Sequence, residues 1–183
     1  GVAKDAAKAI EWYKRAFEGG RGSAANALGV LYQQKDDAQE ALVWFEKAAA
    51  ANNPDGALNA GHAYAARANL QDGAKALSYL QKSADQRPIA LHDLGVLYEE
   101  GRSAPPDPER ARQFYERAVA RQVKEAVQRL ADMYLQGRGI AKDEAKGLNI
   151  LRDAAGRGDG AAAFTLATYY EKGLYVTADP AQQ

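Results

Sequence analysis

The sequence contains no cysteine in its 183 residues. It therefore has no disulfide framework and no thiolate ligands for a metal ion, and its cysteine usage leaves the compartment open. Its 24 basic residues are balanced by 24 acidic residues, so no net field attracts nucleic acid or an anionic membrane. No apolar run approaches the roughly 20 residues that span a bilayer. We therefore expect no nucleic-acid partner and no membrane span in this segment.

The chain also lacks the short motifs that carry catalysis or bind metals and phosphates. HExxH, a Cys/His cluster, GxSxG, GxxxxGK[ST] and GxGxxG do not occur. His62 and His92 lie in different repeats, and a metal site needs more ligands that converge. Although His92 and Asp93 are adjacent, neighbouring side chains on a helix are expected to diverge. We predict no catalytic residue, no metal site and no cofactor, and we expect that the protein is not an enzyme.

What the sequence does contain is a repeated phrase. LGVLY occurs at residues 28–32 and again at 94–98, and related phrases stand at 60–64, 130–134 and 166–170. The tyrosines that end these phrases are 32 to 36 residues apart, and a second phrase recurs at a similar interval. A period of this length is the signature of a solenoid built from small helical units.

An aspartate stands four residues before each copy of the second phrase. Aspartate accepts hydrogen bonds from the free amides of a first helical turn and complements the positive end of the helix dipole. Each position therefore predicts the start of a helix. The series consists of Asp5, Asp37, Asp72, Asp107, Asp143 and Asp179.

These signals predict alternating A helices, which carry the tyrosine phrase, and B helices, which carry the second phrase. No strand and no boundary between domains is predicted. The A helices are expected near residues 23–34, 55–67, 88–100, 124–136 and 160–172, and the B helices near 5–18, 37–51, 72–86, 107–121 and 143–156.

The second residue of each tyrosine phrase, which we call position g, is always glycine or alanine. The residue at g−5 is also small, whereas g+3 is tyrosine. Small residues allow two helices to approach closely, and the tyrosine fills the space beside them. The B helices carry aromatic pairs that we predict to be core: Trp12 and Tyr13, Trp44 and Phe45, and Phe114 and Tyr115.

The pattern resembles the Sel1-like repeat (SLR) family of the tetratricopeptide-like superfamily, whose unit reads approximately A-x3-LG-x2-Y-x2-G-x-G-V-x2-D-x3-A-x2-WY-x2-A. The resemblance covers essentially the whole chain. Between Tyr32 and Ala41 the glycine loop of that unit is missing, and the spacing is that of a tetratricopeptide repeat. The best-matching stretch, 126–155, carries Ala126, Leu130, Tyr134, Gly137, Gly139, Ile140, Asp143 and Ala154.

The resemblance implies an all-α fold: an α/α right-handed superhelical solenoid of stacked antiparallel helix pairs. It also implies a non-enzymatic scaffold that binds a protein or peptide partner on a concave surface lined by A helices. Such adaptors serve bacterial envelope assembly, polysaccharide export or signalling, which favours the periplasm or cell envelope over the cytoplasm. The alternatives are a cell-wall or polysaccharide-binding module and, less favoured, a hydrolase-like enzyme.

We expect one solenoid domain over residues 1–183, belonging to a longer repeat protein. Terminal helices without partners would leave apolar surface bare, so we also expect self-association through the ends. In the last A helix, Leu166, Tyr169 and Tyr170 are the residues expected to be exposed. The expected units are a partial unit 1–22, repeats 23–53, 54–87, 88–123 and 124–159, and a partial unit 160–183.

The variable A-helix positions g−3, g+1 and g+5 share one helix face and form the candidate partner-binding stripe. The alternative is that this face is merely solvated. The predicted contact residues are Asn26, Leu58, His62, His92, Gln128, Asp132, Phe164 and Thr168.

Overall fold

The computed structural model of the protein describes residues 5–67, 70–102 and 105–175, so the predicted cap Asp179 lies outside the described residues. Over those residues the chain forms helices and no strand, which confirms the expected all-α solenoid. The helices are α1 (Ala6–Glu18), α2 (Gly22–Gln34), α3 (Ala38–Ala50), α4 (Pro54–Ala65), α5 (Leu70–Ser83), α6 (Ile89–Glu100), α7 (Pro108–Ala120), α8 (Glu125–Gln136), α9 (Glu144–Gly156) and α10 (Gly160–Lys172).

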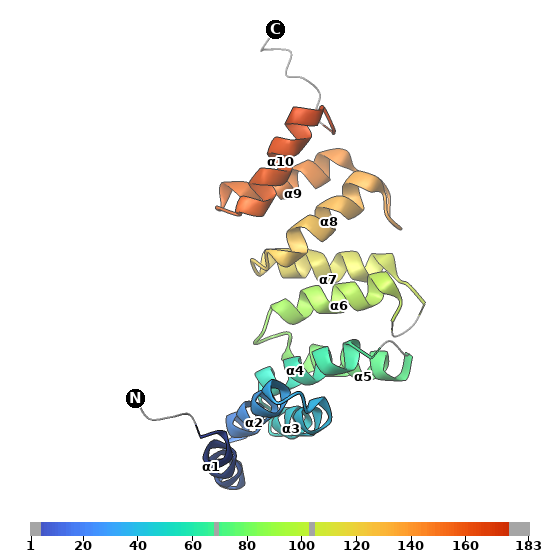
Figure 1. Ribbon diagram of the computed structural model, residues 1–183. Helices are drawn as coiled ribbons and strands as arrows, with labels where there is room; N and C mark the ends of the chain where they lie inside the picture. Colours follow the sequence, from blue (N-terminus) through green and yellow to red (C-terminus); the bar gives the residue numbers. More distant parts are fainter. Residues whose placement is uncertain (1–4, 68–69, 103–104, 176–183) are drawn as a thin grey trace.

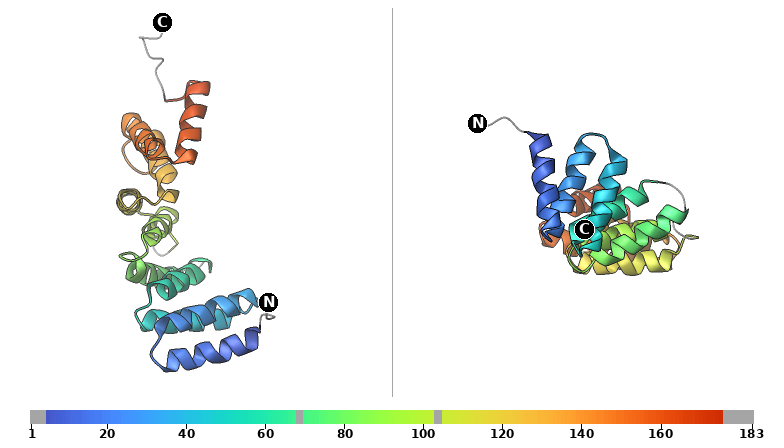
Figure 2. Two further views of the ribbon diagram at one scale, coloured as in Figure 1. Left: turned by 90° about the vertical axis from the view of Figure 1, so that its left-hand side faces the viewer. Right: turned by 90° about the horizontal axis from the view of Figure 1, so that it is seen from below.

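The helices stack in chain order into one elongated column, with α1 and α10 at opposite ends (Figure 1). The even-numbered helices are the A helices and the odd-numbered helices are the B helices. Seen from below, successive pairs are rotated relative to one another, as in a superhelix (Figure 2). The A helices α2 and α4, and likewise α6 and α8, approach each other more closely than any described pair of consecutive B helices does. At these two junctions the A-helix side of the column is therefore more closely packed than the B-helix side.

Aspartates cap most of the B helices as predicted. Each accepts a hydrogen bond from the backbone amide three residues further on, at the start of α1, α3, α7 and α9. Asp72 is the exception, because α5 begins at Leu70 and places Asp72 inside the first turn. An acidic residue at this position still complements the helix dipole. The aspartate therefore predicted the correct first turn of the helix but not the correct N-cap residue. The confirmed caps are Asp5, Asp37, Asp107 and Asp143.

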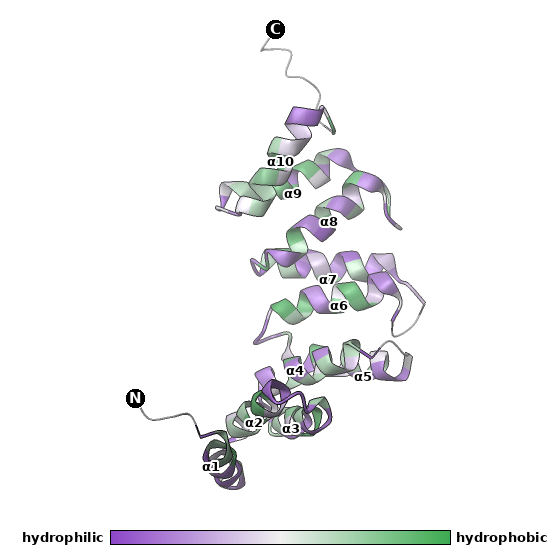
Figure 3. Cartoon of the chain, viewed as in Figure 1, coloured by the Kyte–Doolittle hydropathy of each residue, from purple (hydrophilic) through white to green (hydrophobic). Residues whose placement is uncertain are grey.

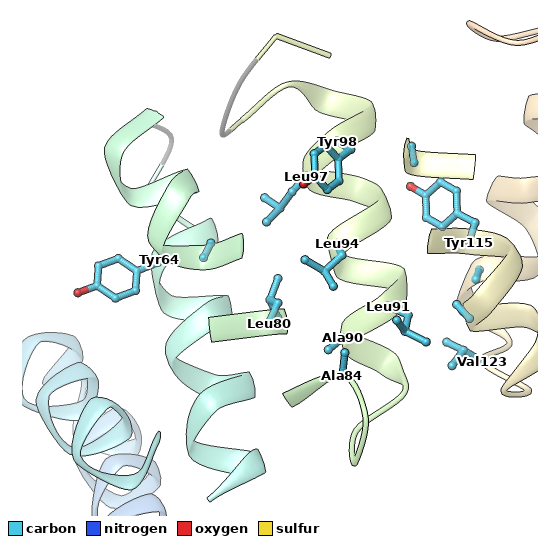
Figure 4. Packing of buried hydrophobic residues seen from close by; sticks show 14 of the residues in the cluster. Tyr64, Leu80, Ala84, Ala90, Leu91, Leu94, Leu97, Tyr98, Tyr115 and Val123 are labelled. Atoms are coloured by element: carbon cyan, nitrogen blue, oxygen red, sulfur yellow. The ribbon is translucent and has the colours of Figure 1, made fainter. Parts of the chain in front are cut away.

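The glycines at position g lie where helices approach most closely. A Cβ atom built on Gly29 would lie 2.4 Å from the Phe45 ring, and one built on Gly95 would lie 2.5 Å from the Tyr115 ring. Figure 4 shows how Tyr115 fills the space beside α6. Such a contact is too short for any side chain, so glycine is required for this packing. Where α8 has alanine at position g, the small residue is instead Gly147 of α9, whose Cβ would lie 2.6 Å from Leu135.

The aromatic pairs of the B helices are core only where both neighbouring helices are present. Trp44, Phe45 and Tyr115 are buried, and Phe114 stacks on Tyr98 with 5.5 Å between ring centroids. For α1 the core prediction is wrong: both aromatic residues of its pair are exposed. No A helix precedes α1 among the described residues, so nothing covers them.

The last A helix shows the same effect at the other end. Tyr170 and Phe164 are exposed, and the predicted exposure of Tyr170 is confirmed. Leu166, however, is buried among residues of α8 and α9, so its predicted exposure is wrong. Tyr169 is also expected to be exposed but is half-buried. Its ring packs edge-on against the Tyr175 ring, with 5.3 Å between the two ring centroids. In α10 the side toward α9 is covered, whereas the side that would receive a following helix is bare.

Most helices carry both hydrophilic and hydrophobic residues along their length (Figure 3). Hydrophobic residues meet inside the column, and the main cluster runs from α3 to α8. The largest buried side chains, among them Leu80, Leu94 and Tyr115, lie between A and B helices (Figure 4). Two smaller clusters lie toward the ends, one among α8, α9 and α10 and one between α2 and α3.

Candidate partner-binding surface

The predicted stripe lies on the A helices, but much of it faces the junctions between repeats. At position g−3, four of the predicted residues are half-buried, whereas the fifth, Phe164, has an exposed fraction of 75%. Phe164 differs because no A helix follows α10 among the described residues. The half-buried residues are Asn26, Leu58, His92 and Gln128.

A polar contact joins each pair of consecutive A helices. The residue at g−2 of the later helix provides it, bonding back to the helix before. The contacts are Asn59 Nδ2 to Asn26 Oδ1 (2.9 Å), Asp93 Oδ2 to His62 Nε2 (2.7 Å), Arg129 to Glu99 Oε2 (3.3 Å) and Thr165 Oγ1 to Gln128 Oε1 (3.0 Å). Position g−2 was not among the predicted contact positions, although it is polar in four of the A helices.

Both histidines of the chain meet at Asp93. His62 Nε2 lies 2.7 Å from one carboxylate oxygen of Asp93, and His92 Nδ1 lies 3.0 Å from the other. The expectation that His92 and Asp93 diverge is wrong, because the aspartate side chain is short enough to turn back toward its neighbour. Burial raises the pKa of Asp93, but the hydrogen bonds from His62 and His92 outweigh it and leave that pKa below its ordinary value.

The remaining predicted stripe residues are held by neighbours on their own helices or close to them. Asp132 accepts a hydrogen bond from Gln128 at 2.9 Å and lies 3.7 Å from the Arg138 guanidinium. The hydroxyl of Thr168 donates to the backbone carbonyl of Phe164 at 3.0 Å. These contacts fix the side chains in place and leave His62 and Phe164 as the most exposed members of the predicted set.

A cleft of about 360 Å³ opens between α2, α3 and α4. Its floor is apolar, and its rim carries amide, imidazole and guanidinium groups. Of the predicted stripe residues, His62 lines it. The lining residues are Gln33, Ala38, Ala41, Leu42, Phe45, Asn59, His62, Ala63, Ala66 and Arg67.

The cleft exists because α4 has a small residue where its counterparts have large ones. Position g+2 is Ala63 in α4, whereas α6 and α8 have Leu97 and Met133 at the same position, both buried. The short connection from α2 to α3, which lacks the glycine loop, places no additional residue over the opening. A cleft of this size with an apolar floor and a few polar groups suits one large apolar side chain of a bound peptide.

Neither a metal-binding cluster nor a membrane-spanning helix occurs among the described residues. In the part of the chain that the structure describes, no cluster of three or more His, Asp or Glu side chains is arranged to hold a metal ion. None of the described helices is both long enough and apolar enough to cross a membrane.

The sequence matches the Sel1 repeat family in six segments that together cover most of the chain. Residues 54–69, which contain α4 and its side of the cleft, lie between two of these segments. No curated protein matches the sequence. The matched segments are residues 1–20, 22–53, 70–87, 88–122, 124–159 and 160–182.

Solved structures with the same architecture include two Sel1-like proteins from bacteria. A Sel1 repeat protein from Oxalobacter formigenes is 28% identical, with a TM-score of 0.78 over 98% of this chain and 74% of that one. The protein c5321, a protective antigen of uropathogenic Escherichia coli with an SLR fold, is also 28% identical, with a TM-score of 0.81. The alignment covers 97% of this chain but only 39% of c5321. MamA, at 16% identity and a TM-score of 0.58, shares the fold alone.

Proposed function

The chain belongs to the Sel1 repeat family, and from this premise we propose that it is a non-enzymatic scaffold that binds a peptide segment of a partner protein along its A helices. Sel1 repeat proteins generally act as scaffolds for protein interactions. The cleft between α2, α3 and α4 is the anchor point of the proposed site. It receives one large apolar side chain of the peptide, and the neighbouring A-helix surface contacts the rest.

The observation that carries this proposal is the combination of shape and chemistry in the cleft. Phe45 and Leu42 provide an apolar floor, and His62, Asn59 and Arg67 stand at the rim. Burying one aromatic or large aliphatic side chain on such a floor contributes about 1.5–3 kcal/mol. The rim groups can bond to peptide carbonyl groups or carboxylates, which fixes the direction of the bound chain.

The position of the cleft in the sequence also supports a role in recognition. One side of the cleft lies on α4, outside the segments that match the family, whereas its floor on α3 lies within one of those segments. Residues that depart from a repeat pattern are free to specify a partner, because the pattern itself is needed for stacking. The similar proteins from Oxalobacter and Escherichia coli support a bacterial setting for the scaffold.

A direct test selects binders from a phage-displayed library of random dodecapeptides and measures the best of them by isothermal titration calorimetry. Ala63→Met places in the cleft the side chain that α8 carries at the same position. We expect it to weaken peptide binding at least tenfold while helical content and melting temperature stay unchanged. Ala145→Met, at an exposed position of α9, is the matched control and should bind as the original protein does.

Two outcomes would contradict the proposal. If the selected peptides bind Ala63→Met as tightly as the original protein, the cleft is not the anchor point. If the selected sequences share no large apolar residue, the floor of Phe45 and Leu42 is not what recognises them. His62→Ala separates the rim from the floor, because it should weaken binding only severalfold.

A further inference from the structure

The B helices carry a regular pairing that the packing of the solenoid does not require. In four of them an aromatic ring is followed three residues later by a basic residue, which places both on one helix face. In each pair the cation lies over the ring. The distances to the ring centroid are 4.9 Å for Arg15 over Trp12, 3.9 Å for Lys47 over Trp44, 5.3 Å for Lys82 over Tyr79 and 5.3 Å for Arg117 over Phe114.

We call Arg15, Lys47, Lys82 and Arg117 the basic row. Each lies at the same position of its own B helix, in α1, α3, α5 and α7, and each is exposed. These B helices follow one another along the column (Figure 1), so the four cations occupy equivalent positions on successive B helices. The fifth B helix, α9, has Ile150 and Asp153 at the two positions, so the cation and the ring are lost together.

The interior cations of the basic row form no ion pair among the described residues, although acidic and basic residues are equal in number in the chain. Arg15 differs, since it pairs with Glu11 at 3.0 Å. Asp85 follows Lys82 by three residues without pairing with it in the described structure. The residues four positions before and four positions after each interior cation carry no acidic group: Val43 and Ala51 for Lys47, Ser78 and Gln86 for Lys82, and Gln113 and Arg121 for Arg117.

The glutamates next to Lys47 and Arg117 in the sequence form hydrogen bonds with other residues. Glu46 precedes Lys47 but turns toward the A helix, where it accepts a hydrogen bond from the Tyr64 hydroxyl at 2.6 Å. Glu116, which precedes Arg117, accepts one from the Tyr134 hydroxyl at 2.8 Å. Glu46 also accepts a hydrogen bond from the Tyr79 hydroxyl at 3.2 Å, and Glu116 pairs with Arg112 and Lys146, so in the described part of the chain neither carboxylate pairs with the neighbouring cation of the basic row.

We propose that the basic row is a second docking surface, which binds an extended acidic segment of a partner protein across successive B helices. Consecutive B helices lie farther apart than helices in direct contact, which are about 8–10 Å apart, and an extended chain rises about 3.3 Å per residue. Acidic residues spaced at least three positions apart can therefore meet one cation after another. Each cation already rests on a ring, so less side-chain entropy is lost when a carboxylate binds.

The geometry favours an acidic peptide over other polyanions. Double-stranded DNA carries one charge per about 1.7 Å, far denser than one cation per repeat, and the chain has no net positive charge. A polysaccharide would need several exposed ring faces on which sugars can stack, but Trp12 is the one exposed ring of the four, Trp44 is buried, and Tyr79 and Phe114 are half-buried. None of the basic-row residues lines the cleft, although α3 carries both Lys47 and part of the cleft floor.

The test uses fluorescence anisotropy at low salt with fluorescein-labelled (Glu-Gly-Ser)4, with (Gln-Gly-Ser)4 as the uncharged peptide. The triple variant Lys47→Gln/Lys82→Gln/Arg117→Gln should weaken binding of the glutamate peptide about tenfold, as expected for three exposed ion pairs. Lys35→Gln/Lys124→Gln/Lys172→Gln removes the same charge from exposed positions outside the row and should change binding less than twofold. Circular dichroism checks that both variants keep their helical content.

A variant that gains affinity is also needed, because a gain in binding cannot be explained by loss of folding. Asp153→Lys extends the row into α9 and should tighten binding of (Glu-Gly-Ser)5 two- to threefold. The proposal is overturned if the original protein does not bind the glutamate peptide, if both triple variants lose affinity equally, or if Asp153→Lys has no effect. It is also overturned if a twelve-residue thymidine oligonucleotide binds the row more tightly than the peptide, because the surface would then serve nucleic acid. Ala63→Met should leave all of these results unchanged, so failure of the cleft and failure of the row are distinguishable.

Discussion

Trp44 and Trp12 hold the same position in two B helices, yet the exposed fraction of their side chains is 7% and 63%. The next residues, Phe45 and Tyr13, differ in the same way, at 2% and 40%. The Phe45 ring is pressed against Gly29 of the A helix that precedes it, whereas Tyr13 has no such helix among the described residues. Whether a side chain at this position is buried thus depends on the neighbouring helix as well as on the residue itself.

The far end of the column repeats the comparison with an A helix. Tyr134 of α8 has an exposed fraction of 6% and Tyr170 of α10 one of 56%, although both are the tyrosine at position g+3. The B helix that follows α8 contributes Lys146, whose ammonium lies 2.6 Å from the Tyr134 hydroxyl. The exposure of this tyrosine therefore depends on whether a following B helix packs against it.

The largest effect is expected from truncating the paired aromatic residues. Phe45→Ala should lower the free energy of unfolding by about 3–5 kcal/mol, because it opens a cavity beside Gly29. Tyr13→Ala, at the equivalent position of α1, should change it by less than about 1 kcal/mol. Urea denaturation followed by circular dichroism measures both. Equal losses would show that α1 is as tightly packed as α3.

A smaller effect, of opposite sign in two regions, is expected from adding a methyl group to a glycine. Gly95→Ala should destabilise the protein by about 1–3 kcal/mol, since the new Cβ would collide with the Tyr115 ring. Gly156→Ala has no heavy atom within 4 Å of the new Cβ. It should stabilise by up to about 1 kcal/mol through helix propensity alone. Thermal and urea unfolding of both variants decide the signs, and stabilisation by Gly95→Ala would refute the close-packing role of position g.

The smallest effect is expected at the polar contacts between A helices. Because its folded pKa is lowered, Asp93 contributes stability above its unfolded pKa of about 3.9, and this contribution is lost as pH falls through the folded value. Asp93→Asn should therefore lower the free energy of unfolding by about 1 kcal/mol at pH 7, and the difference from the original protein should shrink below about pH 4.

The matched variant lies at the terminal junction. Thr165→Val removes the hydrogen bond between α10 and α8 without changing a charge, so its loss of up to about 1 kcal/mol should not vary with pH. Urea denaturation at several pH values compares the two variants. A pH-independent loss for Asp93→Asn would mean that the histidine contacts do not stabilise the ionised carboxylate.

Much of the fold could be predicted because its signals are local. Asp37 and Asp107 mark helix starts through hydrogen bonds to amides three residues away, and the spacing of the tyrosine phrases reveals the unit. The helix start predicted from Asp72 is wrong because an acidic residue is favourable anywhere in the first turn of a helix. Such a residue locates the first turn but not the N-cap. The site was harder to predict. The predicted stripe stays a prediction, and the contacts of Asn59 and Asp93 beside it depend on the angle between repeats, which no single repeat encodes.

The sequence by itself determined the all-α repeat architecture, the positions of most helix starts and the need for glycine where helices touch. These features follow from hydrogen bonding within one turn and from steric limits at one contact, and both act over a few residues. Only the tertiary structure decided that Ala63 leaves a cleft, that two histidines share one carboxylate, and that Trp12 is exposed while Trp44 is buried. The reason is physical: each of these outcomes depends on which side chains a neighbouring helix brings within a few ångströms.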